Sequence, residues 1–483
     1  MKYVLSIDAG TTGITILLID KDTKIIKKEY AELQQYHPHP SWVEHEPLEL
    51  IEKTKHLIER ITQNIDIKEI SAIGITNQRE TVVVWDKNTG KPIYNAIVWQ
   101  CRRTSERCNE LKKQGYEKCV KEKTGLVIDS YFSATKIEWV LKNKTTNSEN
   151  LLCGTIDTWL VWNLTKKHVT DTSNASRTML FNIHTKKWDD ELLQLFKIPK
   201  NILPEVKSSS EIYGYTEINN VKIPLAGIAG DQQAALFGQC CFNKGNIKNT
   251  YGTGCFTLFN TGAMPVKSNN LLTTIAWTIN NKTTYALEGS VFVAGAAVQW
   301  LRDNLNIITR AEETEAIANS IENNENVYFV PALTGLGCPY WDPNARGLII
   351  GLTRATKKEH IVRAALESIA YQSRDVIKTM QKEASISVKE LKADGGAAVN
   401  KFLMQFQADI LNAKVIVPNI TETTALGAAF LAGLAVNFWK DLEEIKSTLK
   451  VKEEYIPNMN EEIRNKLYNK WKEAVERSKN WMQ

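Results

Sequence analysis

Short apolar runs separated by glycine-rich or polar turns fill the first half of the chain. Strands are predicted at residues 3–7 and 14–19, on either side of a Gly/Thr turn, and residues 24–30 are compatible with a third strand. Further predicted elements are a helix at 46–61, strands at 70–75, 82–85 and 93–99, and a segment at 131–140 that begins as a loop and becomes helical. The pattern is typical of an α/β unit.

The second half of the chain repeats this plan. Strands are predicted at residues 245–251 and 255–259, on either side of a second Gly/Thr turn at 252–254. Further predicted elements are strands at 271–278 and 283–287, a helix from near Gly289 through Trp300, a long amphipathic helix at 359–382 and a charged helix at 461–483. The repeat predicts two α/β domains, residues 1–245 and 246–483, that flank a central cleft.

One stretch, residues 226–238, organises the rest of the chain. It begins with small residues and two glycines, and Asp231 then stands where a helix is expected to begin. Such a carboxylate can be an ordinary N-cap that accepts a backbone N–H of the first turn. It can also be a general base at the mouth of a cleft, with Gln232 beside it to bond a substrate hydroxyl. The pattern alone leaves both roles open.

Three glycine-containing turns are candidates for phosphate or nucleotide binding. The turn at residues 8–13 offers backbone N–H groups and hydroxyls to phosphate oxygens, and Asp8 could hold magnesium through water. The turn at 252–254 has the same composition. Residues 392–400 combine a strand end, a glycine turn and a helix start, which suits an anion or a nucleotide. Each turn can equally be purely structural, and the chain contains neither a Walker A loop nor a GxGxxG fingerprint.

Two adjacent residues of opposite charge stand at the end of one of the predicted buried strands. Arg79 and Glu80 either form a structural ion pair or supply donors and an acceptor to a hydroxylated ligand. Trp99 follows a later strand, where it can belong to the core or form a platform for a ligand.

Composition excludes several classes of protein. With 483 residues and a net charge of +5, the chain is too weakly basic to favour nucleic acid or an anionic membrane as a partner. No apolar run is long enough to span a bilayer, so no membrane insertion is expected. The beginning of the chain reaches an acidic residue too soon for a signal peptide. The eight cysteines form no metal-binding spacing, which favours reduced thiols in a cytoplasmic protein.

These motifs together resemble the glycerol kinase branch of the FGGY carbohydrate kinase family, over essentially the whole length of the chain. Residues 131–143 are similar to the first signature of the family, and residues 347–367 to its second. Residues 74–81 and 95–100 resemble the glycerol kinase branch specifically.

The resemblance implies two ribonuclease-H-like domains, as in actin, hexokinase and the heat-shock ATPases. It implies transfer of the ATP γ-phosphoryl group to glycerol, giving sn-glycerol 3-phosphate for glycerol catabolism and glycerolipid synthesis. It also implies Mg²⁺ with ATP, a cytoplasmic location and a homo-oligomer, either a dimer or a tetramer.

The resemblance also assigns roles to residues. Asp231 is the general base, and the glycerol hydroxyls are bound by Arg79, Glu80, Tyr131, Asp231 and Gln232. The rings that pack on the glycerol carbons are Trp99 and Phe256. The phosphates face Thr11, Thr12, Gly13 and Thr253, and the nucleotide is bordered by Gly295, Gln299, Gly396 and Asn400. Asp8 helps to place Mg²⁺ through water.

Three departures from the family pattern stand out. The first turn has Ala9 where glutamine is usual and Thr15 where an arginine near the phosphates is usual. The loop at residues 218–223 lacks the glycine-rich, arginine-containing insert that binds fructose 1,6-bisphosphate in some bacterial relatives, so little inhibition by that sugar is expected.

Two other functions compete with this one. A kinase for another polyol or a ketose would share the fold, although Arg79, Glu80 and Trp99 argue against it. An actin-like or chaperone-like nucleotide switch would keep the phosphate turns. It would leave the hydroxyl-binding set around Asp231 and Gln232 unexplained.

Overall fold

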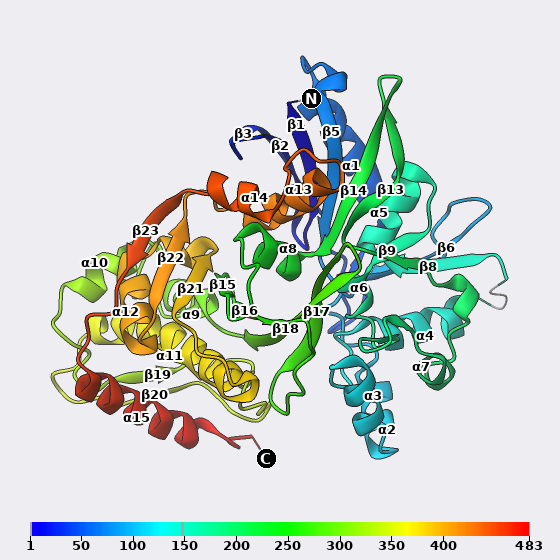
Figure 1. Cartoon of the computed structure of the whole chain (residues 1–483). Helices are drawn as coiled ribbons and strands as arrows, with labels where there is room; N and C mark the ends of the chain where they lie inside the picture. The colour runs from blue at the N-terminus through cyan, green and yellow to red at the C-terminus, as the bar shows by residue number, and fades with distance from the viewer. Residues whose placement is uncertain (1, 146–148, 483) are drawn as a thin grey trace.

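A computed structural model of the chain describes residues 2–145 and 149–482, and it consists of two α/β halves that lie side by side (Figure 1). The first half contains a six-stranded sheet in the order β13-β14-β5-β1-β2-β3. Its strands are β1 (Tyr3–Ala9), β2 (Gly13–Asp20), β3 (Ile25–Glu32), β5 (Ile70–Asn77), β13 (Ser210–Ile218) and β14 (Val221–Gly230). The helices of this half are α1 (Pro47–Thr62), α2 (Ser105–Lys113), α3 (Glu117–Thr124), α4 (Ser133–Lys144), α5 (Ile156–Thr165), α6 (Thr172–Ala175), α7 (Asp190–Leu195) and α8 (Asp231–Gly238).

The second half contains a seven-stranded sheet in the order β17-β18-β16-β15-β21-β22-β23. Its strands are β15 (Ile247–Tyr251), β16 (Cys255–Gly262), β17 (Leu272–Ile279), β18 (Lys282–Val291), β21 (Glu390–Asp394), β22 (Lys414–Pro418) and β23 (Val451–Tyr455). The helices that follow β18 are α9 (Gly295–Asp303), α10 (Glu313–Asn319), α11 (Lys358–Ala384), α12 (Lys401–Leu411), α13 (Thr423–Ala435), α14 (Leu442–Thr448) and α15 (Glu461–Ser478).

Smaller sheets complete the chain. A four-stranded sheet joins β4 (Glu44–His45), β7 (Ala96–Ile97), β6 (Val82–Asp86) and β8 (Leu151–Thr155). Two-stranded sheets join β9 (Val169–Asp171) with β12 (Glu205–Lys207), β10 (Phe181–Asn182) with β11 (Lys187–Trp188), and β19 (Tyr328–Val330) with β20 (Leu348–Ile350). None of the helices within residues 2–145 and 149–482 is both long and apolar enough to cross a bilayer.

Parallel pairing in the first sheet determines where the site forms. Strand β5 lies between β1 and β14 and runs parallel to both, with Asn77 opposite Ala9 on one side and Gly230 on the other. The three strands therefore end at the same edge of the sheet. The residues that follow them, namely the first Gly/Thr turn, Arg79 and Asp231, meet there although they are far apart in sequence.

The second sheet repeats this arrangement, as the sequence predicts. Strands β15 and β16 form an antiparallel pair around the turn at residues 252–254, and β15 runs parallel to β21 with Thr250 opposite Asp394. The second Gly/Thr turn and the Gly395–Gly396 turn consequently lie at one edge of this sheet.

The predicted start of the helix near Gly289 is wrong, because the helix begins later in the chain. Strand β18 continues to Val291 because residues 288–291 pair with β16, and α9 starts only at Gly295. Gly289, Ser290 and Val291 are weak helix formers, and backbone pairing with β16 keeps them in the strand. The strand predicted at 93–99 is reduced to Ala96–Ile97.

Helix α13 comes from the second half of the sequence but packs against β1, β5 and β14 of the first sheet, beside α8 (Figure 1). Leu5 and Ile7 of β1 face α1 and α5, whereas Val4 faces the cluster that includes α8 and α13. Both faces of the sheet are thus covered, as parallel strands require. The proposed domain boundary at residue 245 falls between the two sheets, and α13 crosses it.

Helices α8 and α13 approach each other through glycines. A Cβ atom on Gly427 would stand 1.9 Å from the backbone oxygen of Ala234, and a Cβ on Gly238 would stand 1.9 Å from the backbone oxygen of Thr423. Because these neighbours are backbone atoms, only glycine allows the two helices to cross this closely.

We therefore expect Gly427→Ala to lower the free energy of unfolding by at least about 2–3 kcal/mol, since the helices would have to move apart. Gly396→Ala is the matched control, because no atom lies within 4 Å of the added Cβ in the described structure. Urea-induced unfolding of both variants checks this expectation. Equal stability of the two would contradict the close crossing.

Candidate active site

A cavity of about 480 Å³ opens beside the second Gly/Thr turn. Its lining includes the five nucleotide residues of the second half that the sequence predicts: Thr253, Gly295, Gln299, Gly396 and Asn400. They come from the β15–β16 turn, from α9, from the turn after β21 and from the start of α12. The fold thus brings together residues that are spread over about 150 positions of the sequence, and the cavity has a size that suits a nucleotide.

The backbone around this cavity requires glycine at defined places. The N–H of Gly295 donates to the backbone oxygen of Gly252, and a Cβ on Gly295 would lie 2.7 Å from that oxygen. Gly395 has a φ of 89°, and its Cβ would lie 2.5 Å from the backbone oxygen of Tyr251. Only glycine therefore allows α9 and the turn after β21 to pack this closely against the end of β15 and the turn that follows it.

The first Gly/Thr turn lies at the edge of the other sheet. The backbone oxygens of Thr11 and Thr12 accept from Gln35 and Tyr30, which fixes the turn. Trp99 donates its indole N–H to the Thr11 hydroxyl at 2.9 Å, and its ring meets the ring of Tyr131 edge to face. Trp99 thus links the phosphate turn to the residues predicted to bind the polyol.

Two other predicted residues also flank these turns. Phe256 is half-buried on β16, just after the second turn. Thr15, which departs from the family pattern, lies on β2 opposite Asp8.

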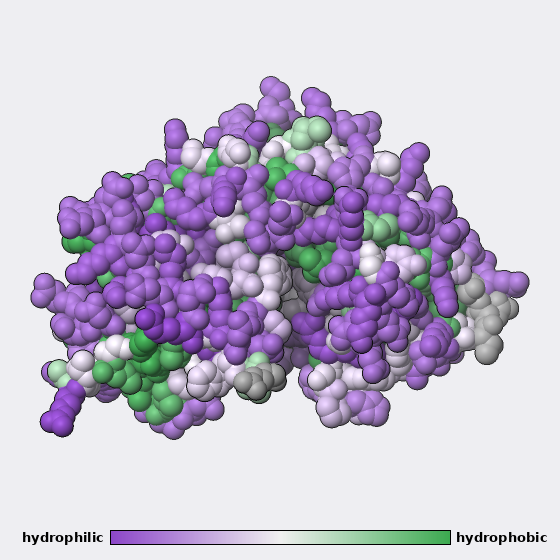
Figure 2. Space-filling view, turned by 90° about the horizontal axis from the view of Figure 1, so that it is seen from below, coloured by the Kyte–Doolittle hydropathy of each residue, from purple (hydrophilic) through white to green (hydrophobic). Residues whose placement is uncertain are grey.

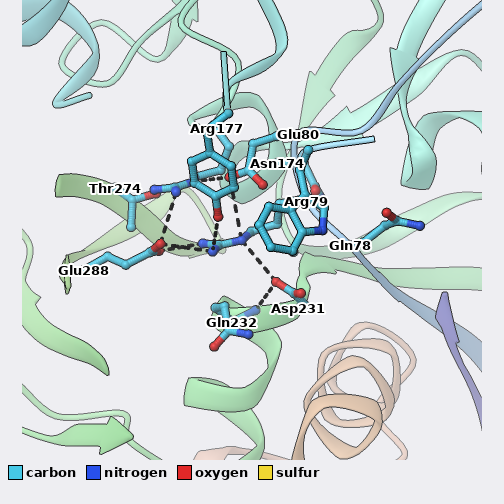
Figure 3. Close-up of polar contacts among 12 residues, drawn as sticks. Gln78, Arg79, Glu80, Asn174, Arg177, Asp231, Gln232, Thr274 and Glu288 are labelled. Atoms are coloured by element: carbon cyan, nitrogen blue, oxygen red, sulfur yellow. Dashed lines mark hydrogen bonds and ion pairs between the residues drawn. The ribbon is translucent and has the colours of Figure 1, made fainter. Parts of the chain in front are cut away.

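Arg79 lies at the centre of a buried charged cluster (Figure 3). Its guanidinium is only 2% exposed, and it donates to both carboxylate oxygens of Glu288, at 2.5 and 3.0 Å. Its Nε lies 3.1 Å from Oδ1 of Asp231, on the side of the cluster where α8 begins. A bidentate pair of this kind holds the planar guanidinium in one orientation.

A second buried arginine holds Glu80. Arg177 donates from Nε to Oε1 of Glu80 at 2.7 Å and from Nη2 to Oε1 of Glu288 at 3.1 Å. Glu80 has a φ of 61°, a left-handed conformation that is uncommon outside glycine, so surrounding contacts must fix its backbone. Burial would raise the pKa of Glu288, but Arg177 and Arg79 outweigh it and lower that pKa to about 2.

The sequence predicts Arg79, Glu80, Tyr131, Asp231 and Gln232 in this region but misses Glu288 and Arg177. A charge inside the apolar run at 283–291 was the available signal for Glu288, because a buried acid needs a partner. The sequence prediction ends a strand at residue 287 and begins a helix near Gly289, so Glu288 falls between the two predicted elements. Arg177 lies in a short mixed segment with no periodicity.

Asp231 is the first residue of α8 and is not its N-cap. Gly230 occupies the cap position, and Oδ1 of Asp231 accepts the N–H of the next residue, Gln232, at 2.6 Å, beside its ion pair with Arg79. The N-cap interpretation of Asp231 is therefore wrong, although its carboxylate still lies at the positive end of the helix. Burial raises the pKa of Asp231 while Arg79 opposes the shift, and 29% of the side chain remains exposed.

Gln232 is oriented by Lys248, a buried residue on β15. The Nζ of Lys248 donates to Oε1 of Gln232 at 2.5 Å and to the hydroxyl of Thr250 at 2.9 Å. Because an ammonium group can only donate, the amide oxygen of Gln232 is occupied. Its amide nitrogen is left to donate to another group.

Asp8 faces Asp231 from the end of β1. Burial and the nearby charge of Asp231 raise the pKa of Asp8 to about 7. Two carboxylates that repel each other next to the first Gly/Thr turn form a site at which a cation would be favoured.

The surface seen from below is mostly hydrophilic, and a furrow separates the two halves near its centre (Figure 2).

Both halves of the chain match domains of one known protein family. Residues 3–238 match the N-terminal domain of the FGGY family of carbohydrate kinases, and residues 247–436 match its C-terminal domain. The chain is 58% identical to "Glycerol kinase 2" of Thermotoga maritima, covering 100% of this chain and 99% of that protein. It is 57% identical to a glycerol kinase of Caldanaerobacter subterraneus, covering 99% of both chains.

Solved structures agree with these sequence matches. The structure of Plasmodium falciparum glycerol kinase with ADP superposes with a TM-score of 0.95 at 38% identity, covering 100% of this chain and 99% of that one. A ligand-bound xylulose kinase from Lactobacillus acidophilus gives a TM-score of 0.90 at 25% identity, with 98% of this chain and 97% of that one covered. The fold is therefore the two-domain α/β fold of these kinases. Because both halves match the family's two domains in order, the chain belongs to the FGGY family of carbohydrate kinases.

Proposed function

We propose that this protein transfers the γ-phosphoryl group of ATP to glycerol, forming sn-glycerol 3-phosphate and ADP, with Asp231 as the general base. One observation supports this proposal above the others. Asp231 is held by Arg79 at 3.1 Å, at the sheet edge where the first phosphate turn and the hydroxyl-binding residues meet. Relatives named glycerol kinase, at 57–58% identity over the full length, support glycerol as the substrate.

The proton of the reacting hydroxyl goes to Asp231. Its Oδ1 already accepts the N–H of Gln232 and faces Nε of Arg79, which orients the carboxylate. Oδ2 is then the oxygen that takes the proton, while the glycerol oxygen forms its bond to the γ-phosphorus and the bond to the ADP oxygen breaks. Burial of Asp231 supports this role because it makes the carboxylate a stronger base.

Selection of glycerol rests on hydroxyl recognition, because a three-carbon polyol has little apolar surface. The amide nitrogen of Gln232 supplies a donor and the carboxylate of Glu80 supplies an acceptor. Arg79 is proposed to bind a hydroxyl by exchanging one of the contacts that its N–H groups make within the cluster, such as that with the Tyr131 hydroxyl. Tyr131 contributes a hydroxyl, with its oxygen 3.3 Å from Nη2 of Arg79. The rings of Trp99 and Phe256 complete the proposed pocket by packing on the carbon chain.

Mg²⁺ is proposed to accompany ATP, held by Asp8 through water. Burial and, after it, the charge of Asp231 raise the pKa of Asp8, and a divalent cation would offset the repulsion between the two carboxylates. The described residues contain no group of three or more metal-ligating side chains, and Mg²⁺ that arrives with a nucleotide needs only one or two carboxylates. When bound, the ion supplies charge neutralisation to the phosphates.

On the strength of the family resemblance, we also propose that the reaction takes place in the cytoplasm, in glycerol catabolism and glycerolipid precursor supply, and that the protein is a homo-oligomer, a dimer or a tetramer. Phosphate contacts are proposed for Thr11, Thr12, Gly13 and Thr253, and nucleotide contacts for Gly295, Gln299, Gly396 and Asn400.

We expect glycerol to be the preferred acceptor in an assay of ADP release across glycerol, xylulose, gluconate and other small polyols. ADP release without an acceptor should be slow by comparison, because water lacks the hydroxyl contacts that position glycerol. Preference for xylulose or gluconate would contradict glycerol as the substrate. Acceptor-independent hydrolysis would instead favour a nucleotide switch.

Asp231→Asn should reduce kcat by about 10²–10⁴-fold, because an amide cannot accept the hydroxyl proton. The fold should survive, since Gly230 and not Asp231 caps the helix. Asp190→Asn is a matched control, because Asp190 is likewise the first residue of its helix but is 75% exposed and remote from the cluster. Turnover and thermal melting of both variants are the measurements. Near-normal turnover in a folded Asp231→Asn protein would remove the general base from the mechanism.

Asp8 should make stability depend on pH. Its ordinary pKa of 3.8 applies to the unfolded chain, whereas the folded pKa is about 7. The folded state therefore binds the extra proton between these values, and the contribution of Asp8 to stability falls as the pH rises from about 4 to about 7.

The asparagine of the Asp8→Asn variant cannot ionise. The free energy of unfolding of this variant, relative to that of the native protein, should therefore rise by about 1–3 kcal/mol between pH 5 and pH 8. Urea-induced unfolding without Mg²⁺ or nucleotide measures this difference. Asp190→Asn, which removes an exposed carboxylate, should show no such gain. A difference that does not change with pH would show that Asp8 is not perturbed by burial and Asp231.

A further inference from the structure

Glu288 is the member of the charged cluster that belongs to the second half of the chain. It lies on β18 with a side chain that is 0% exposed, and Arg79 and Arg177 of the first half both donate to it. Its carboxylate lies beside the guanidinium of Arg79 and is joined to both arginines by hydrogen bonds (Figure 3). A carboxylate this deeply buried is stable only when it is paired, so its two arginines are obligatory partners.

The contacts of Arg79 show which groups the carboxylate of Glu288 helps to position. Nη1 donates to Glu288 and to Gln233, Nη2 donates to Glu288 and to the Tyr131 hydroxyl, and Nε faces Asp231. Two of the five N–H groups are thus directed to Glu288. With the guanidinium fixed in this way, its other N–H groups are directed to the proposed base Asp231, to Gln233 and to the hydroxyl of Tyr131.

Arg177 extends the same control to Glu80. Its Nη2 donates to Glu288 and its Nε to Oε1 of Glu80, so one oxygen of the proposed polyol acceptor is fixed and the other is left for a hydroxyl. Arg177 is 0% exposed and contacts both Glu80 and Glu288. It can therefore affect the acceptor site through Glu80 and, by way of Glu288, through Arg79.

We propose that Glu288 and Arg177 are positioning residues for the acceptor site, which set the orientation of Arg79 and Glu80 and so determine its selectivity for the glycerol hydroxyls. This inference rests on the proposed function of the site. It also means that the second half of the chain, through β18, takes part in recognising the acceptor as well as the nucleotide.

The test compares Glu288→Gln with the native protein in steady-state kinetics. The amide keeps one acceptor oxygen but loses the charge and the second acceptor that hold the two guanidiniums. KM for glycerol should rise by roughly 10- to 100-fold, the range expected for losing a charge-assisted hydrogen bond. KM for ATP should change by less than about twofold, because the nucleotide cavity does not include Glu288.

Selectivity between acceptors is a second measurement, because a purely structural role of Glu288 would leave it unchanged. The preference for glycerol over propane-1,2-diol, which lacks one hydroxyl, should shrink by roughly tenfold in Glu288→Gln, because Arg79 and Glu80 are no longer held to read that hydroxyl. Glu367→Gln is the matched control. Glu367 is a buried glutamate paired with Arg363 at 2.9 Å on α11, and its loss should lower thermal stability without altering KM for glycerol or this preference.

Removing one charge from a buried cluster can prevent folding. The double variant Arg177→Gln/Glu288→Gln removes one positive and one negative charge, so the net charge of the cluster is preserved while both contacts are lost. It should show the same rise in KM and the same loss of preference. Unchanged glycerol KM and unchanged preference in either folded variant would overturn the positioning role.

The same assay separates this inference from the proposed function. If the native protein turns over glycerol and the variants behave like it, only the positioning role is rejected. If the native protein shows no glycerol-dependent turnover, the proposed function fails, and the acceptor-site role of Glu288 fails with it.

Discussion

The burial of the Arg79 guanidinium is the constraint on which the site depends. At 2% exposure, it must be surrounded by acceptors, and the chain supplies Glu288 and Asp231 directly. The balancing charges come from both halves of the molecule, so the cluster forms only when the two sheets are in place. The same requirement brings the carboxylate of Asp231, the proposed base, next to the fixed guanidinium of Arg79, while 29% of the Asp231 side chain stays exposed.

The placement of those groups follows from strand pairing. Strands β1, β5 and β14 are parallel and end together, which puts a phosphate turn, a guanidinium and a carboxylate at one edge. The second sheet has its own turn and nucleotide cavity at its edge. In the proposed function, two copies of one arrangement therefore have different roles, with the phosphates bound between them and the acceptor on the side of the first sheet.

The junction between the halves is unusually close. Helix α13 leaves the second half and covers the first sheet, and it crosses α8 through Gly238 and Gly427. Since α8 begins with Asp231, the position of the proposed base depends on this crossing as well as on Arg79. Because backbone atoms are in contact where α8 and α13 cross, the two helices have little room to move there. A change in the angle between the halves would therefore shift Asp231, the proposed base.

The sequence by itself determined the strand–turn–strand repeat, the two α/β halves, the Gly/Thr turns and the helix start at Asp231, because these depend on neighbouring residues and on glycine at fixed places. It also supplied the family, whose signatures are contiguous. The tertiary structure alone decided that β18 extends through Glu288, that Arg79 is held by that carboxylate, and that Gly230 caps α8 instead of Asp231. These outcomes are pairings between residues that lie far apart in the chain or depend on one backbone angle. Local periodicity carries no information about which distant partner satisfies a buried charge.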